Sequence, residues 1–292
     1  MSALTNRSPR RAPLRLLGRP GSFVRRATAT PALLAGLVMT TVLVLIAVLA
    51  PVLATHDPAQ QNLTGILLGP TAENWFGTDQ LGRDIYSRLI FAARTDLTLA
   101  GLAVITPFVV GVSLGLISGY FGGWVDWIVS RITETVIAFP FYIIIIVIVF
   151  AVGVGQSGIV AAFTLVGWVA FARVVRASTR TLVGSEWVSA ARGLGLPHAR
   201  ILVRHLLPNV LPQAVVILMT EIVLVMVAIV TLGYLGLGVQ PPTADWGTMI
   251  AEGQPFMLTK WWLSVVPGLA VVYSGIALSL VGDGLADVWR VK

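Results

Sequence analysis

The chain of 292 residues contains no cysteine, only two lysines and few charged side chains of either sign. The absence of cysteine excludes disulfides, thiolate metal sites and cysteine nucleophiles. Charged residues make up 11% of the chain, whereas a soluble domain has about 25%. Hydrophobic residues make up 56%, and the mean hydropathy is +0.87. This composition excludes a soluble globular enzyme, a disordered chain and a fibrous repeat, and it predicts a polytopic membrane protein.

Recognisable catalytic and metal-binding patterns are missing as well. An ATP-driven motor needs a glycine-rich loop that ends in lysine to hold the phosphates, and neither Lys260 nor Lys292 follows such a loop. The three histidines have no second ligand at metal spacing, and there is no Gly-x-Ser-x-Gly motif. We therefore predict a non-enzymatic protein with no catalytic residue, no metal site and no cofactor of its own.

Six uncharged or nearly uncharged segments are long enough to cross a membrane. A bilayer core about 30 Å thick requires about 20 apolar residues per helix. One uncharged run of 38 residues is too long for a single helix, and its centre, Gly153–Gly158, has the composition of a turn. We expect an all-α fold whose six transmembrane helices cover residues 32–54, 97–119, 136–153, 158–175, 210–234 and 262–283.

Basic residues indicate how these spans are oriented. Fifteen Arg and Lys residues fall in the segments on the same side as the N-terminus, and four fall on the other side. Basic residues favour the cytoplasmic side, so both termini are expected in the cytoplasm. The predicted organisation is a basic cytoplasmic tail over 1–31, a first span over 32–54, an external segment over 55–96, a five-helix core over 97–287 with a cytoplasmic loop at 176–209, and a cytoplasmic C-terminus over 288–292.

The external segment contains a second helical pattern. Apolar residues recur at helical spacing between residues 79 and 96, and Asp84 and Arg88 are four residues apart. Opposite charges at this spacing support a helix. We expect a separate amphipathic helix that lies at the outer membrane interface.

Two features within the spans call for an explanation. Glu221 lies about eleven residues into the fifth span, where a carboxylate is costly and normally faces a bundle interior or an aqueous path. It could contact a translocated solute, such as an ammonium group, or it could be a structural acid at a subunit seam. Gly111, Gly115 and Gly119 repeat every four residues, and this spacing predicts the close approach of another helix.

The cytoplasmic loop 176–209 has ordered start and stop signals. Residues 186–193 suit a short helix, Gly195 suits its C-terminal cap, and Pro197 prevents its continuation. Residues 198–207 form a second stretch that would place Arg200 and Arg204 on one face. The loop could be an inert connector, but its length and its signals favour a docking element.

The same loop resembles the "EAA" segment of binding-protein-dependent ABC importer permeases. Ala190-Ala191, Gly195 and Leu207-Pro208 stand at the spacings of that pattern. Ser189 replaces the acid of the pattern and His205 replaces its isoleucine, so Glu186 is the candidate for the local acid.

Further segments are similar to the C-type permease subunit of dipeptide, oligopeptide and nickel importers. They stand in the family's order between about residue 70 and residue 287. One departure is that Glu221 lies about two turns before the position, near Ile229, where the relatives carry a glutamate. The similar segments are Phe76–Arg88, Leu235–Pro242, Asp245–Gly247, Trp261-Trp262 with Pro267-Gly268, and Gly282–Leu285.

The resemblance implies the type I ABC importer permease fold and a role as half of a translocation path for di- or oligopeptides. It implies a second, homologous permease subunit, two ATPase subunits that bind ATP and Mg, and an external peptide-binding protein, all at a bacterial cell membrane. The resemblance also implies that residues of the cytoplasmic loop couple this subunit to the ATPase. These are Glu186, Ala190, Ala191, Arg192, Gly195 and Pro197.

Two alternatives remain at this point. A permease for nickel or another small solute would be built in the same way. A proton-coupled secondary carrier would need paired acids within the spans, for which Glu221 alone is thin support.

Overall fold

Helices follow the uncharged segments, and residues 30–289, which the computed structural model describes, contain no β-strand. Five helical segments are long and apolar enough to cross a membrane, and a bent pair of helices makes a sixth if it is counted as one span. The expected all-α fold is therefore confirmed, and the expected number of spans is reached with the bent pair. The five segments are Pro31–Val48, Ile85–Phe121, Gln156–Val183, His198–Tyr234 and Trp262–Trp289, and the pair is Gly123–Ala138 with Phe141–Val152.

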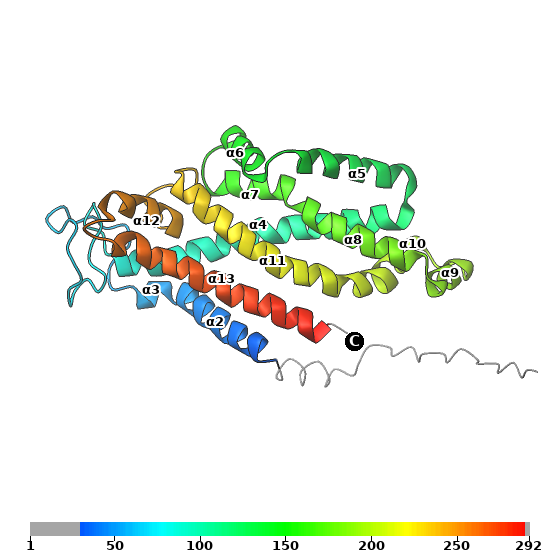
Figure 1. Ribbon diagram of the computed structural model, residues 1–292, viewed down its shortest axis with the longest axis horizontal. Helices are drawn as coiled ribbons and strands as arrows, with labels where there is room; N and C mark the ends of the chain where they lie inside the picture. The colour runs from blue at the N-terminus through cyan, green and yellow to red at the C-terminus, as the bar shows by residue number, and fades with distance from the viewer. Residues whose placement is uncertain (1–29, 290–292) are drawn as a thin grey trace, which may run out of the picture.

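The long helices run roughly along the long axis of the molecule (Figure 1). The loop over residues 54–84 and the short helix α12 lie at one end, and α9 lies at the opposite end, towards which α2 begins and α13 finishes. The elements are α2 (Pro31–Val48), α3 (Ala50–Leu53), α4 (Ile85–Phe121), α5 (Gly123–Ala138), α6 (Phe141–Val152), α7 (Gln156–Val166), α8 (Trp168–Val183), α9 (Glu186–Gly193), α10 (His198–Arg200), the π-helix η1 (Ile201–Leu206), α11 (Leu207–Tyr234), α12 (Trp246–Gly253), the 3-10 helix η2 (Gln254–Phe256) and α13 (Trp262–Trp289).

The prediction of a separate amphipathic helix over residues 79–96 is wrong. Helix α4 is continuous for 37 residues from Ile85, so its first part is an extension of the second span. Asp84 is the N-cap, and its carboxylate accepts a hydrogen bond from the Ser87 N–H at 2.8 Å. Because Asp84 caps the helix, the expected pair with Arg88 does not form, and Arg88 instead pairs with Asp79 and Glu252.

The third span is also not the single straight helix expected over 136–153. Helices α5 and α6 meet at an angle of 97°. Phe139 is extended and Pro140 caps α6, because the proline ring disfavours a helical conformation in the residue before it. The turn expected at Gly153–Gly158 is present, since α6 ends at Val152 and α7 begins at Gln156.

The glycine repeat on α4 packs against α8, as the sequence predicts. A Cβ atom on Gly111 would lie 2.4 Å from the Trp168 carbonyl oxygen, and one on Gly115 would lie 2.7 Å from the Ala172 oxygen. At Gly119 the corresponding distance, to the Arg176 oxygen, is 2.8 Å. No side chain fits these gaps, so the two backbones are in direct contact.

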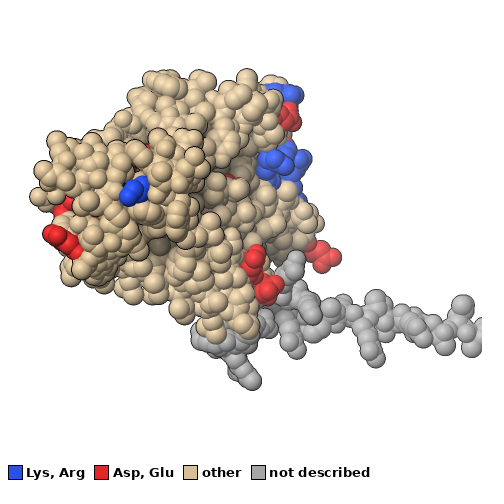
Figure 2. All heavy atoms as spheres, turned by 60° about the vertical axis from the view of Figure 1, so that its left-hand side comes forward, with Lys and Arg blue, Asp and Glu red and all other residues tan. Residues whose placement is uncertain are grey.

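The first span joins the rest of the bundle in a similar way. Gly36 of α2 lies against the backbone of Val281 in α13, and Gly284 of α13 lies against Leu33. Figure 2 shows a broad surface of uncharged residues, with most of the visible charged side chains near its left and right sides. Helices that face lipid are expected to carry few charged side chains. The basic segment 1–31 lies almost entirely outside the described residues.

Candidate functional site

Helix α9 begins and ends where the sequence predicts. Glu186 occupies its first turn, where a negative charge is favourable next to the partial positive charge of the helix end. The Gly195 N–H donates to the Arg192 carbonyl at 2.9 Å, and the Leu196 N–H donates to the Ala191 carbonyl at 3.2 Å. These two bonds define a Schellman cap, and Gly195 supports it with a φ of +70°. Pro197 then caps α10.

The two faces of α9 have different roles. Val188 and Ala191 are buried within the chain, in a cluster with Ile201 and Leu206. Ala190 is exposed, and Leu194, just after the helix, is 82% exposed. The structure therefore separates two residues that the sequence pattern groups together, because Ala191 packs inwards and Ala190 is exposed.

An aromatic anchor that the sequence analysis missed holds α9 against the last turn of α4. The Arg192 guanidinium lies 4.5 Å from the centre of the Tyr120 ring, a distance typical of a cation–π contact. The Tyr120 hydroxyl forms a hydrogen bond of 2.7 Å with His198 Nδ1. Arg192 and His198 are 72 and 78 positions from Tyr120 in the chain, so no local pattern could reveal the two contacts.

The stretch 198–207 is helical, but not as a simple α-helix. Between α10 and α11 the backbone forms the π-helix Ile201–Leu206. Pro208 lacks the N–H that an α-helix would donate four residues back, at Arg204, and a π-helical turn is one way in which a helix accommodates such a defect. The α-helical spacing that we used to place Arg200 and Arg204 on one face therefore does not hold.

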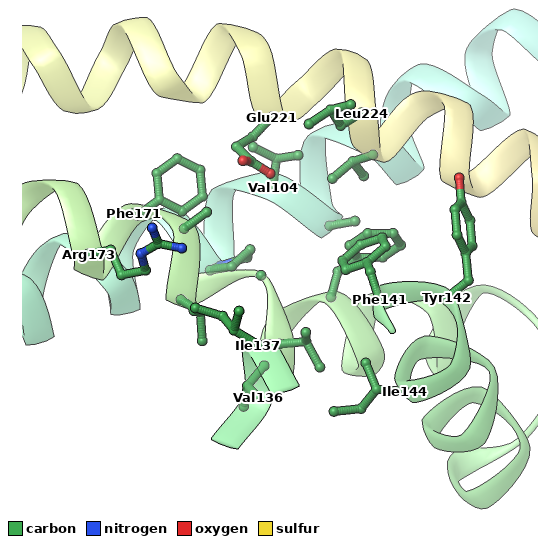
Figure 3. Close-up of a pocket in the computed structure, with 18 of the residues that line it drawn as sticks. Val104, Val136, Ile137, Phe141, Tyr142, Ile144, Phe171, Arg173, Glu221 and Leu224 are labelled. Carbon is green, nitrogen blue, oxygen red and sulfur yellow. The ribbon is translucent and has the colours of Figure 1, made fainter. Parts of the chain in front are cut away.

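Glu221 lines a cavity of about 480 Å³ between α11, α4, α8 and the α5–α6 bend (Figure 3). Its walls are mostly aliphatic and aromatic, and Arg173 of α8 is the one basic residue among them. The cavity also includes Phe141, Tyr142 and Phe171. Glu221 thus lies at a cavity, and Arg173, which no sequence motif marks as functional, lies at the same cavity.

At the opposite end, two arginines and two acids form a buried cluster. Arg83 donates to both Glu252 carboxylate oxygens at 3.0 and 2.9 Å, and to Asp79 at 2.7 Å. Arg88 donates to Asp79 and, at 2.9 Å, to Glu252. The side chains of Arg83 and Arg88 are 4% and 2% exposed. This ion-pair cluster of Asp79, Arg83, Arg88 and Glu252 connects the loop before α4, and the first turn of α4, to α12.

Comparison with known proteins identifies the kind of molecule that carries these features. Residues 111–289 match the family model for the binding-protein-dependent transport system inner membrane component. The chain belongs to this family. Residues 21–70 match the N-terminal transmembrane domain of oligopeptide transport permease C, so the two matches together include the first span and most of the core.

Relatives of this family member match over most of their length. The chain is 35% identical to the dipeptide transport system permease protein DppC of Bacillus subtilis, over 92% of this chain and 84% of the relative. It is 36% identical to the glutathione transport system permease protein GsiD of Pectobacterium atrosepticum, over 77% of this chain and 74% of the relative. A chain of the inward-facing MetNI methionine ABC transporter has the same fold, with a TM-score of 0.54 at 17% identity over 70% of this chain and 97% of that chain.

The family segment Asp245-Trp-Gly247 has a clear structural role. Asp245 caps α12 by accepting the Thr248 N–H at 2.9 Å, and burial raises the pKa of its carboxyl. The Trp246 N–H donates to Asp96 at 3.0 Å. A Cβ atom on Gly247 would lie 2.3 Å from the Val230 carbonyl oxygen. Asp245 therefore begins α12, Trp246 fastens it to α4, and Gly247 lets it pack against the backbone of α11.

Proposed function

We propose that this chain is the permease subunit of an ATP-driven importer of peptides. The observation that carries the proposal is the identity of about one third, over most of both chains, to several permeases named for dipeptide or peptide transport. The same family membership supports a binding-protein-dependent system. The chain would form half of a translocation path with a second, homologous permease subunit.

Energy and substrate delivery would come from other chains. No P-loop is present in the sequence, so two separate ATPase subunits would bind ATP and Mg, and an external peptide-binding protein would deliver the peptide. The test is to purify the complex in mild detergent and to measure ATP-dependent peptide uptake after reconstitution. Two ATPase chains and a second permease should co-purify. Uptake by this chain alone, driven by a proton gradient without ATP, would refute the proposal.

We further propose that α9 docks onto an ATPase subunit in the cytoplasm. Its surface lies at the end of the bundle away from α12 (Figure 1), and its exposed face includes Ala190 and Leu194. A charge buried without a partner costs several kcal/mol, which is more than a typical coupling free energy of about 1–3 kcal/mol. Ala190→Glu and Leu194→Asp should therefore impair ATPase association or uncouple ATP hydrolysis from uptake.

The structure also selects the control for this experiment. Leu258 lies on the loop between η2 and α13 and is fully exposed, so Leu258→Asp adds the same charge away from α9. Ala191→Glu is unsuitable, because Ala191 is buried within the chain and the variant would also disturb folding. Normal ATPase binding and uptake in both α9 variants would assign α9 to a connector and move the docking surface elsewhere.

The proposed orientation places both termini and α9 in the cytoplasm of a bacterial cell. It rests on the distribution of Arg and Lys. Because the chain contains no cysteine, Ser189→Cys in α9 and Thr243→Cys before α12 give single labelling sites, and both positions are exposed. In intact cells an impermeant thiol reagent should label only the cysteine at 243, and labelling of the one at 189 would overturn the orientation.

A further inference from the structure

Two opposite charges in the cavity have no partner among residues 30–289. Neither Glu221 nor Arg173 forms a hydrogen bond or an ion pair with any residue between 30 and 289, and they do not pair with each other. Figure 3 shows the Glu221 carboxylate extending from α11 and the Arg173 guanidinium extending from α8 along the same cavity. Glu221 is partly buried against apolar walls, where a charge is costly unless it meets a partner, and Arg173 is exposed. Each group is therefore available to a ligand.

The rest of the cavity limits what that ligand can be. The volume of about 480 Å³ is within the range of roughly 300–1,000 Å³ found for small-molecule sites. Apart from the Tyr142 hydroxyl, the remaining side chains of the walls offer aromatic and aliphatic surface. A divalent cation would require several oxygen ligands, but the lining supplies a single carboxylate and places a cation beside it. The lining instead suits a molecule with one positive end, one negative end and an apolar or variable middle.

We propose that Glu221 receives the terminal ammonium and Arg173 the terminal carboxylate of a short peptide within the cavity. This inference rests on the proposed function and adds two specificity-determining residues to it. Each contact is a charge-assisted hydrogen bond, and Arg can bind a carboxylate through two parallel N–H groups. The recognised features are common to all peptides with free ends, so this site selects by charge at the ends and not by side chain.

The experiment compares one peptide in three forms: trialanine with both ends free, N-acetylated trialanine and C-amidated trialanine. Uptake is measured with the reconstituted complex and saturating binding protein, and each variant rate is divided by the wild-type rate for the same form. Any preference of the binding protein then cancels. Glu221→Gln should slow uptake of the two forms with a free ammonium by about tenfold, which is the effect of losing one charge-assisted hydrogen bond. Uptake of the acetylated form should stay near its wild-type rate.

Arg173→Gln should show the reverse selectivity. It should slow the two forms with a free carboxylate by about tenfold and spare the amidated form. Glu221→Asp retains the charge and should lose less than Glu221→Gln. Arg131→Gln is the matched control, because Arg131 is exposed and does not line the cavity, and it should affect all three forms equally and slightly.

Other outcomes would overturn the inference. If Glu221→Gln slows all three forms by the same factor, Glu221 pairs with a neighbouring subunit and does not bind peptide. If combining both substitutions restores uptake of all forms, the two residues pair with each other in the working complex. Both results require a wild-type complex that transports peptides, whereas failure of the proposed function itself would appear as an absence of wild-type uptake.

Discussion

The ion-pair cluster gives the sharpest stability prediction. Glu252 accepts hydrogen bonds from two arginines whose side chains are almost fully buried. In Glu252→Gln both arginines would have to share Asp79, and the cluster would change from neutral to a net charge of one. Removing one partner of a buried ion pair costs about 3–5 kcal/mol, because a charge is left buried without compensation.

The expected change is large enough to measure in detergent. At roughly 2–4 °C per kcal/mol, the scale for domains of about this size, the variant should melt about 6–20 °C below the wild type. The assay follows the fraction of protein that stays monodisperse on size exclusion after heating. Arg131→Gln is the control, because it removes an ion pair whose side chains are 62% and 63% exposed, and such pairs contribute about 0–1 kcal/mol.

A double variant separates charge balance from packing. Arg88→Met with Glu252→Gln restores neutrality to the cluster, so the loss of stability should be smaller than the sum of the two single losses. If the losses simply add, or if Glu252→Gln melts like Arg131→Gln, then Arg83 and Arg88 do not depend on Glu252 and the reasoning from burial is refuted.

Three further predictions concern packing, pH and the anchor of α9. Gly115→Ala places a Cβ atom 2.7 Å from the backbone of α8 and should lower the melting temperature. Gly268 has open space around it, so Gly268→Ala should leave the melting temperature unchanged or raise it, because alanine favours a helix over glycine by up to about 1 kcal/mol. Burial raises the pKa of Asp245 in the folded chain. The stability of the wild type relative to Asp245→Asn should therefore be greatest near or below pH 4, about the pKa of an unfolded Asp, and should fall as the pH rises through the folded pKa. A difference in melting temperature that does not change with pH would contradict this prediction. Tyr120→Phe loses only the hydrogen bond to His198, and Tyr120→Leu also loses the cation–π contact with Arg192. Hydrogen exchange in α9 should therefore increase from the wild type to Tyr120→Phe and then to Tyr120→Leu. Equal protection in the three proteins would mean that Tyr120 does not anchor α9.

Hydrophobic pattern and local signals predicted much of the fold. The long apolar helices, the turn after Val152, the cap at Gly195 and the close packing of Gly115 all follow from residues next to one another in the chain. Two errors came from local signals that were given too little weight. Pro140 bends the third span, and Asp84 caps a helix where we expected it to form an ion pair.

The contacts that build the candidate sites are mostly out of reach of such reasoning. Glu252 meets Arg88 from 164 positions away, and Tyr120 meets His198 from 78 positions away. Arg173 is one of several arginines near span ends in the sequence, and only the fold brings it into the cavity of Glu221. The inward turn of Ala191 likewise depends on how α9 packs against Ile201, which the residue pattern does not specify.

Helix α4 connects the two ends of the molecule as a single rod. Its first turn is held by the ion-pair cluster through Arg88, and its last turn carries Tyr120 and therefore α9. Pro107 lies inside it, about 33 Å from the start and about 21 Å from the end at 1.5 Å per residue. If α4 tilted as a rigid body about the level of Pro107, a sideways movement of about 3 Å at the α12 end would become a movement of about 2 Å in the opposite direction beneath α9. Such a tilt would link the two ends of the chain through one helix rather than through a series of side-chain contacts.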